Sequence, residues 1–375
     1  MHLSLGQQDM VVAIMVAGAI TGSLFAGFLA DRLGRWLTIV LTDLTFIAGG
    51  AVLFSAHNPG GWRFMFGLAS LLAVLQLTGM AFMPLSPRWL VSRGRRNEAR
   101  AVLLRIRDSQ DDVDRELSEI ERSNSDTDGS LEELLTKWRM PLLVTTSLAV
   151  FQQLTGHSNL LNFTSDIFLL SGFRGAAPAV VLGVVKVIAT IMAILWLDKV
   201  GRKPFLLWGS VGVTCSLAVL SISFAARLPG LAFAASAGLV ASYALSFGPV
   251  TWLVTAEMFP AGIRGKALGI GQVGSFVGNL AASSFFLRLL HAAGGAITFF
   301  LFAAIVFLAT VFILLVVPET KDKEPHSIAA NLPECGCCPT YAELVDEGMT
   351  DELAEIDNAP GEGTPLSGAG AESWV

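Results

Sequence analysis

Several polar side chains stand inside long apolar stretches of the chain, where an uncompensated polar group is expensive. Two adjacent amides, Gln152 and Gln153, lie in the middle of one such stretch. Each amide supplies two N–H donors and an acceptor oxygen, which complements the hydroxyl groups of a polyol. Amide bonding between neighbouring helices is the alternative role for such residues. The two glutamines are therefore candidate ligand-binding residues.

Four further residues of the apolar stretches have types suited to ligand contact, namely Asn159, Asn279, Trp252 and Lys186. The two asparagines repeat the amide chemistry, and helix packing explains them equally well. Trp252 offers a flat apolar face, although a lone Trp is more often a packing residue or a membrane-interface residue. Lys186 carries a charge within a stretch, so its ammonium group should face water or a partner, and a structural ion pair is the rival explanation.

The composition identifies an integral membrane protein. Hydrophobic residues make up 53% of the 375 residues, charged residues only 15%, and the mean hydropathy is +0.61, which is unusual for a soluble domain. A bilayer core requires about 20 apolar residues per helix, and continuous runs of this length indicate helices rather than barrel strands. The expected fold class is all-α, with nine spans at residues 10–30, 37–55, 64–83, 142–161, 177–197, 205–225, 231–256, 267–287 and 296–317.

A charged turn occurs twice, each time between two apolar runs. The first, D-R-L-G-R, contains Asp31, Arg32 and Arg35, and the second, D-K-V-G-R, contains Asp198 and Arg202. Glycine permits a tight reversal of the chain, and the arginine beside it is suited to carboxylates or helix C-termini. Two such turns indicate two parallel repeats related by an axis along the membrane normal.

Lys and Arg in the connections set the expected orientation. Placing the first charged turn in the cytoplasm puts most of the 25 basic residues there, with the N-terminus outside and the C-terminus inside. Residues 84–140 then form a cytoplasmic linker with an arginine-rich start. We expect this start either to lie on the anionic leaflet or to be a solvated charged loop. Residues 318–375 form an acidic tail that is expected to be disordered.

Four stretches carry a resemblance to a known family. F-Q-Q-L-T-G-H-S-N (151–159) and F-G-P-V-T-W-L-V-T-A-E-M-F-P-A-G-I-R-G-K-A (247–267) resemble the seventh-span and tenth-span signatures of sugar porters in the major facilitator superfamily. S-P-R-W-L (86–90) and V-P-E-T-K (317–321) resemble the motifs that close the two halves of family members. Within the family, G-H-S-N, G-P-V-T-W and Lys186 look most like the divergent third class of animal facilitative glucose transporters.

The resemblance implies a major facilitator fold with an incomplete N-terminal bundle. Matched motif to motif, the chain lacks the family's first, fourth and fifth spans, the last two from between Ser55 and Trp62. Such a chain looks like a truncated or alternatively spliced product, or an imperfect gene model. The implied parts are an incomplete N-terminal bundle of three spans (1–83), the linker (84–140), a complete six-helix C-terminal bundle (141–317) and the tail (318–375).

The resemblance also implies roles for individual residues. The implied substrate-binding residues are Gln152, Gln153, Asn159, Lys186, Trp252 and Asn279. A cytoplasmic cluster is expected to hold the inner gate shut, and its implied members are Asp31, Arg32, Arg35, Asp198, Arg202, Glu257, Arg264 and Glu319. In the N-terminal half, Leu85 replaces the family's glutamate and Trp36 stands where a base is usual, which weakens that half's share of the gate.

The implied function is facilitative transport of hexose-type sugars by alternating access, without a cofactor. Two alternatives remain open, a transport-inactive truncated isoform of such a carrier and a proton-coupled sugar symporter. The expected partners are a small-molecule sugar and the bilayer of the plasma membrane or an endomembrane, and no nucleic acid. The sequence has no metal motif, nucleotide-binding loop or nucleophile elbow, so an enzyme is not expected.

Overall fold

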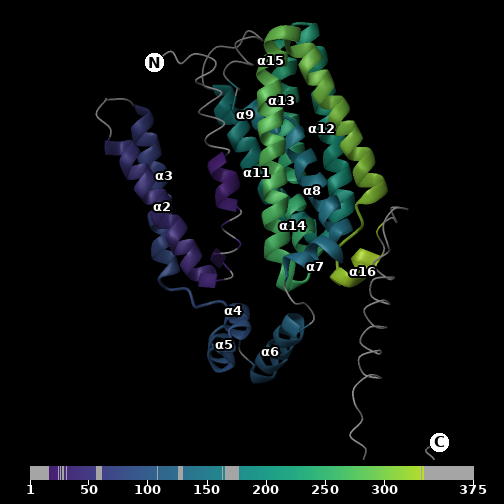
Figure 1. Cartoon of the computed structure of the whole chain (residues 1–375). Coiled ribbons are helices and arrows are strands. Elements are labelled where there is room, and N and C mark those ends of the chain that lie inside the picture. The colour runs from purple at the N-terminus through teal and green to yellow at the C-terminus, as the bar shows by residue number, and fades with distance from the viewer. Residues whose placement is uncertain are drawn as a thin grey trace, which may run out of the picture. The chain divides into compact units, whose positions relative to one another are not determined.

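The computed structural model describes residues 17–23, 25, 27, 29–30, 32–55, 61–107, 109–125, 130–162, 164, 177–330 and 332. The regular elements of this described part are all α-helices (Figure 1). They are α2 (Arg35–Ser55), α3 (Gly61–Met80), α4 (Pro87–Ser92), α5 (Arg96–Leu103), α6 (Gln110–Ser125), α7 (Leu131–Thr136), α8 (Arg139–Leu154), α9 (His157–Asn162), α11 (Ala177–Val200), α12 (Arg202–Ala225), α13 (Pro229–Leu245), α14 (Phe247–Glu257), α15 (Ala261–Val316) and α16 (Pro325–Ala330).

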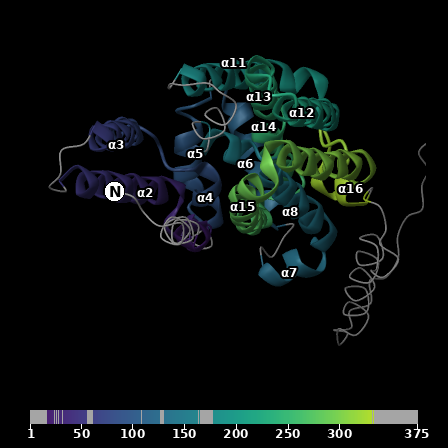
Figure 2. The same ribbon diagram turned by 90° about the horizontal axis from the view of Figure 1, so that it is seen from above.

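The helices α8, α9 and α11–α15 form one bundle, shown from the side in Figure 1 and from above in Figure 2. Within it α12 packs against α13 and α15, and α8 packs against α15. Fully buried apolar side chains such as Leu148, Val213 and Leu239 fill its interior. Large apolar side chains such as Ile194 and Trp208 face outward, as expected where lipid rather than water covers the surface.

Three breaks interrupt the helices of this bundle. Gly156 separates α8 from α9 and lies so close to the ring of Phe302 that a Cβ atom would be 2.9 Å from it. α13 and α14 meet at Ser246, which has φ −116° and ψ −82°. α15 is interrupted at Gly294, between two of the predicted spans. Breaks of this kind leave backbone carbonyl groups available to side chains of neighbouring helices.

The structure supports an all-α membrane protein. Each predicted span from residue 37 onward coincides with helix, and the last two predicted spans are the two parts of α15. The predicted first span, 10–30, lies mostly outside the described residues, so the count of nine stays a prediction. In the described part, the helices long and apolar enough to cross a membrane are Ala179–Val200, Arg202–Ala225, Pro229–Glu257 and Arg288–Val316.

The linker predicted at 84–140 contains a small helical cluster rather than an open loop. The helices α4, α5 and α6 share an apolar core, whose buried members are Leu90, Ala99, Leu103, Val113 and Leu117. Each fully buried aliphatic side chain contributes roughly 1.5–3 kcal/mol relative to an exposed one. A core of this kind explains why a strongly charged segment is helical.

Acidic residues of α6 pair with part of the arginine-rich start of the linker. The pairs, with N–O distances of 2.8 to 2.9 Å, are Arg96–Glu121, Arg100–Asp114 and Arg107–Glu116. They are largely exposed, so each stabilises the cluster by at most about 1 kcal/mol. Part of the positive charge expected to face a leaflet or solvent is therefore already paired within the linker.

The compact unit of the chain extends further than the sequence indicated. It ends at Leu332, whereas the disordered tail was expected from residue 318. α16 carries Ile328 and Ala329 as buried side chains, and the ring of His326 lies 5.1 Å from that of Trp138, which precedes α8. These contacts explain why the residues after α15 are ordered. The second unit, Pro333–Val375, lies outside the described residues.

Candidate functional site

Gln152 ties the end of α8 to the start of α14. Its Nε2 donates a hydrogen bond of 2.8 Å to the backbone carbonyl oxygen of Phe247, beside the break at Ser246. The side chain is buried, and its Oε1 has no hydrogen-bond partner among the described residues. Gln152 therefore uses one end of its amide for interhelical bonding, the alternative foreseen from the sequence, and leaves the other end unpaired.

Gln153 connects α8 to α15 through a network of neutral polar groups. Its Nε2 donates to Oγ of Ser275 at 2.8 Å. Its Oε1 accepts from Nδ2 of Asn279 at 3.0 Å and from Oγ of Ser158 at 3.4 Å. Amide and hydroxyl groups at such a place can exchange partners with the hydroxyl groups of a neutral ligand. Two predicted site residues, Gln153 and Asn279, are thus in direct contact.

One face of α15 contributes more to the site than the sequence analysis recognised. Asn159 is buried, and its Oδ1 accepts a hydrogen bond of 2.8 Å from Oγ of Ser283. Ser275, Asn279 and Ser283 follow one another at intervals of four residues, which places them on one face of the helix. Only the asparagine was among the predicted binding residues, although the four-residue spacing was a visible signal for the two serines.

Two aromatic residues beside the glutamines were also missed. The imidazole ring of His157 stacks on the ring of Tyr243, with ring centroids 3.7 Å apart and planes 7° apart. Both side chains are buried, and neither Nδ1 nor Nε2 of His157 has a hydrogen-bond partner in the described part of the chain. An ionisable residue within a predicted span was the available signal.

The remaining two predicted binding residues lie apart from this network. Trp252 is half-buried on α14, and its ring faces α15 closely enough that a Cβ atom on Gly271 would be 3.9 Å from it. Lys186 is exposed on α11, and none of the hydrogen bonds of the network includes it. The structure therefore brings together Gln152, Gln153, Asn159 and Asn279, whereas, among the described residues, Lys186 is joined to them by no hydrogen bond but lies close enough for its charge to act on His157.

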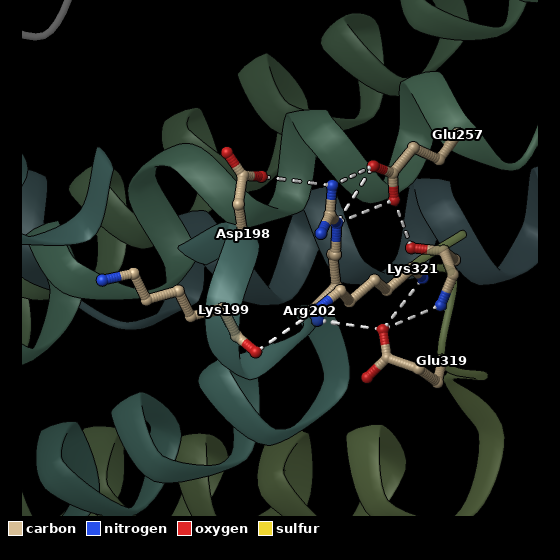
Figure 3. A network of polar contacts seen from close by, with 7 residues as sticks. Asp198, Lys199, Arg202, Glu257, Glu319 and Lys321 are labelled. Carbon is tan, nitrogen blue, oxygen red and sulfur yellow. Dashed lines mark hydrogen bonds and ion pairs between the residues drawn. The ribbon is translucent and has the colours of Figure 1, made fainter. Parts of the chain in front are cut away.

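The second charged turn forms a cluster of carboxylates around Arg202 (Figure 3). Nη2 of Arg202 lies 2.8 Å from Oε1 of Glu257, and its Nε lies 3.0 Å from the same oxygen. Oδ1 of Asp198 is 3.5 Å from Nη2, and Thr320 donates to the second carboxylate oxygen of Glu257. A paired guanidinium–carboxylate contact of this kind is directional as well as charged. It joins α12 to α14 and to the segment after α15.

Glu319 caps the same turn from the segment that follows α15. Its carboxylate accepts backbone hydrogen bonds, and the donors are the N–H groups of Arg202 (2.9 Å), Lys203 (3.1 Å), Thr320 (3.0 Å) and Lys321 (3.0 Å). Burial favours the protonated acid, but these hydrogen bonds together outweigh burial and hold the pKa of Glu319 below its usual value. The carboxylate thus stays charged and fixes the start of α12.

Arg264 lies beside this cluster but is not a full member of it. Its Nε donates to the backbone carbonyl oxygen of Phe259 at 3.1 Å. Burial, and then the positive charges of Arg88 and Arg35, lower the pKa of Arg264, while Glu257 acts in the opposite direction. Within the described part of the chain, its guanidinium forms no ion pair shorter than 4.0 Å with that carboxylate. The expected cluster therefore forms around Arg202.

The first charged turn has a different environment. Arg32 and Arg35 are exposed, and the predicted gate residue Asp31 lies outside the described residues. Gly34 has φ +85°, and a Cβ atom there would lie 3.0 Å from the indole ring of Trp89. The turn is therefore packed against an aromatic ring of the linker.

Comparisons with known proteins agree on one family. The family model described as "Sugar (and other) transporter" matches residues 4–60 and 54–332. The chain is 38% identical over 397 residues to the probable metabolite transport protein CsbC of Bacillus subtilis, covering 87% of this chain and 86% of that protein. It is 28% identical over 401 residues to the glucose transporter GlcP of Staphylococcus epidermidis, with 87% and 89% covered.

Solved structures of transporters share the fold. The proton:xylose symporter XylE bound to 6-bromo-6-deoxy-D-glucose matches with a TM-score of 0.74 at 22% identity, over 87% of this chain and 89% of that chain. The inward-open form of XylE from E. coli matches with a TM-score of 0.69 at 21% identity, over 88% and 91%. At such identities the likeness concerns the fold alone. The proteins named in these matches are transporters rather than enzymes.

Proposed function

We propose that this chain, which belongs to the sugar transporter family of the major facilitator superfamily, binds a hexose-type sugar at the polar network of α8, α9, α14 and α15. The family model and the relatives confirm the resemblance predicted from the motifs. The homologues are transporters of sugars and metabolites. The single observation that carries the proposal is the contact of Gln153 with Ser275 and Asn279 across two helices.

The chemistry of this network suits a neutral polyol. The side chains in contact with Gln153 are amides and hydroxyls, which carry no charge and offer both donors and acceptors. A sugar hydroxyl also donates and accepts, so it can take over either partner of an existing bond. Trp252 adds a flat apolar ring near α15, which is suited to the apolar face of a pyranose ring.

Equilibrium binding of radiolabelled D-glucose to the purified chain tests the proposal. We expect Gln153→Ala to weaken binding by about tenfold or more, because it removes hydrogen bonds to the ligand and leaves buried groups unpaired. Gln76→Ala is the matched control, since it deletes the same amide from an exposed position on α3. Equal affinities for Gln153→Ala and the parent chain would show that the site is elsewhere.

A second candidate, that the chain binds sugar but carries it poorly, is favoured by the form of the alignments. The alignment with CsbC is 397 residues long, whereas 87% of this chain's 375 residues is about 326 residues, so about 70 aligned positions have no residue of this chain. That length corresponds to two spans with their connections. It supports, as a proposal, the absence of the family's fourth and fifth spans.

Loss of two spans would impair alternating access, because this mechanism requires two opposed bundles around a central site. Polar surface that the missing helices cover would also meet lipid, at a cost of several kcal/mol for each unsatisfied group. Liposomes containing the purified chain should therefore take up radiolabelled glucose much more slowly than liposomes containing the glucose transporter GlcP. Saturable uptake at a comparable rate would exclude this second candidate.

The mode of transport, the orientation of the two termini and the membrane are also part of the proposal. We expect facilitative transport, in which no proton binds together with the sugar. The affinity for glucose should therefore be similar at about pH 6 and about pH 8. Tighter binding at the lower pH would favour the proton-coupled alternative. We also expect the N-terminus outside and the C-terminus in the cytoplasm, at the plasma membrane or an endomembrane. Terminal epitope tags probed in intact and permeabilised cells would distinguish this topology from one with both ends inside.

A further inference from the structure

We infer that His157 is an additional sugar-contacting residue, placed at the break between α8 and α9. The inference rests on the proposed function, because it assigns a further side chain to the same site. It concerns the part of the site where polar atoms are left unpaired. The predicted binding residues did not include His157.

His157 is a buried polar side chain without an internal partner. Its relative exposure is 4%, and both ring nitrogen atoms lack a hydrogen bond within the described part of the chain. Leaving a buried donor or acceptor unsatisfied carries the full desolvation penalty of that group. Most buried polar groups in folded proteins are paired. A side chain that is held in place at this cost is suited to a partner that arrives from outside the protein.

Two more buried polar atoms without a hydrogen-bond partner in the described part of the chain belong to α8 and α14. Among the described residues, Oε1 of Gln152, on the last turns of α8, has no hydrogen-bond partner, and neither has Oγ1 of Thr251 on α14. Gln152 is tied to the carbonyl group of Phe247, one helical turn before Thr251. His157 lies on Tyr243, one turn before Phe247. The unpaired polar groups therefore lie along the α13–α14 junction, over the roughly two helical turns from Tyr243 to Thr251.

This region differs from the neighbouring network around Gln153. There the amide is bonded at both ends, to Ser275 and to Asn279. At the break, within the part of the chain that the structure describes, the amide of Gln152 is bonded at one end only and neither ring nitrogen of His157 is bonded. The site thus has a paired side on α15 and an unpaired side along α13 and α14. A polyol with hydroxyl groups on both faces would exchange bonds on the first side and form new bonds on the second.

The position of the imidazole ring is fixed well enough to select among hydroxyl groups. Stacking on Tyr243 restricts the plane of the ring, and Gly156, the residue before it, is held tightly against Phe302. A neutral imidazole offers one N–H donor and one acceptor nitrogen in that plane. A ring held in this way contacts particular sugar hydroxyls rather than all of them.

Binding of D-glucose and its monodeoxy analogues to the purified full chain tests the inference. His157→Phe keeps a stacked ring but removes both polar atoms, and we expect it to weaken glucose binding by about tenfold. The same substitution should have almost no effect on the one deoxy analogue that lacks the contacted hydroxyl. His157→Gln, which keeps a donor and an acceptor, should retain more affinity than His157→Phe. An equal loss for every analogue, or no loss for any, would overturn the inference.

A second measurement does not depend on the Phe variant being folded. In chain labelled with ¹⁵N-histidine, glucose should shift the ring nitrogen resonances of one of the five histidines, and that pair of resonances should be missing in His157→Gln. If Gln153→Ala abolishes binding but no histidine resonance of the parent chain responds, the proposed function stands and the role of His157 is excluded. If the parent chain binds no sugar, both fail together.

Discussion

The two glycine–arginine turns share a sequence pattern, but the glycine of each turn lies against a different kind of side chain. At the second turn Gly201 has φ +101°, and a Cβ atom there would lie 2.9 Å from Oε2 of Glu319. At the first turn Gly34 has φ +85°, and its Cβ would lie 3.0 Å from the indole ring of Trp89. The same backbone reversal therefore admits a carboxylate in one half of the chain and an aromatic ring in the other.

The difference follows from one position after the closing proline of each half. The second half reads Pro318-Glu319, and the corresponding place in the first half reads Pro84-Leu85. Glu319 accepts hydrogen bonds from backbone N–H groups, whereas Leu85 packs against the apolar core of α4, α5 and α6. Two copies of a turn can thus keep their backbone while one becomes an ionic contact and the other an apolar one.

The largest effect is expected from Glu319→Leu, which gives the second turn the residue of the first. It removes the acceptor of four backbone N–H groups and the carboxylate beside Gly201. Because the site is only partly buried, water can replace some of these bonds, so we expect a loss of about 2–3 kcal/mol in the free energy of unfolding. Denaturation of the purified chain, followed by circular dichroism, would measure it.

The reciprocal change, Leu85→Glu, is the control for that experiment. It places a carboxylate against an apolar core, so it should destabilise the linker by about 1 kcal/mol or more rather than stabilise it. If Leu85→Glu raised stability, the first turn would have retained unused donors. The two turns would then differ only in the side chain after the proline, and not in the environment that they offer to a carboxylate.

The next largest effect concerns the two glycines. Gly201→Ala should cost about 2–3 kcal/mol, because the new methyl group meets Glu319 in a backbone conformation that strongly favours glycine. Gly34→Ala should cost less, since the indole ring of Trp89 is the side chain that must move. Adding Trp89→Leu should recover part of the loss at Gly34, whereas Glu319→Ala should not rescue Gly201→Ala. Equal costs and equal rescue would contradict the proposed difference.

The sequence was sufficient to identify the residues that have unusual types or positions. Gln152, Gln153 and Asn279 stood out as amides in apolar spans, and the structure places all three in interhelical hydrogen bonds. Leu85 stood out because an acid was expected there. Each of these features needs only the local sequence and the motif, without knowledge of which helix is the neighbour.

Other features depend on helix rotation and on distant parts of the chain. Serine and threonine hydroxyls in helices commonly bond to a carbonyl group of their own helix, as Thr145 and Ser236 do. Residue type did not distinguish them from Ser275 and Ser283, which bond to side chains of α8 and α9; only the four-residue spacing from Asn279 did. Likewise, the packing of Trp89 on Gly34 joins two segments 55 residues apart, and no local pattern indicated it.

A smaller effect is expected from exchanging arginine for lysine in the two turns. Arg202→Lys loses the paired contact with Glu257, and we expect it to cost about 1 kcal/mol, since the ammonium group cannot reproduce the planar fork. Arg35→Lys changes an exposed side chain and should alter the free energy of unfolding by less than about 0.5 kcal/mol. Thermal unfolding of both variants would compare them. A larger loss at Arg35 would mean that the first turn also contains a specific ionic contact.

The smallest effect is a difference in pH dependence. The pKa of Glu319 is lowered in the folded chain, so its contribution to stability is complete above the unfolded pKa of about 4.3 and is lost as the pH falls through the folded value. Glu319→Gln should therefore lose less stability than the parent chain on acidification, while the other carboxylates act equally in both.

At the first turn the effect of pH on stability is expected to have the opposite sign, because burial against the apolar core should raise the pKa of the new carboxyl group in Leu85→Glu. That variant should gain stability relative to the parent chain as the pH falls. Unfolding measured from about pH 7 to about pH 2.5 would reveal the two slopes, and slopes of the same sign would show that the two turns offer a carboxylate the same environment.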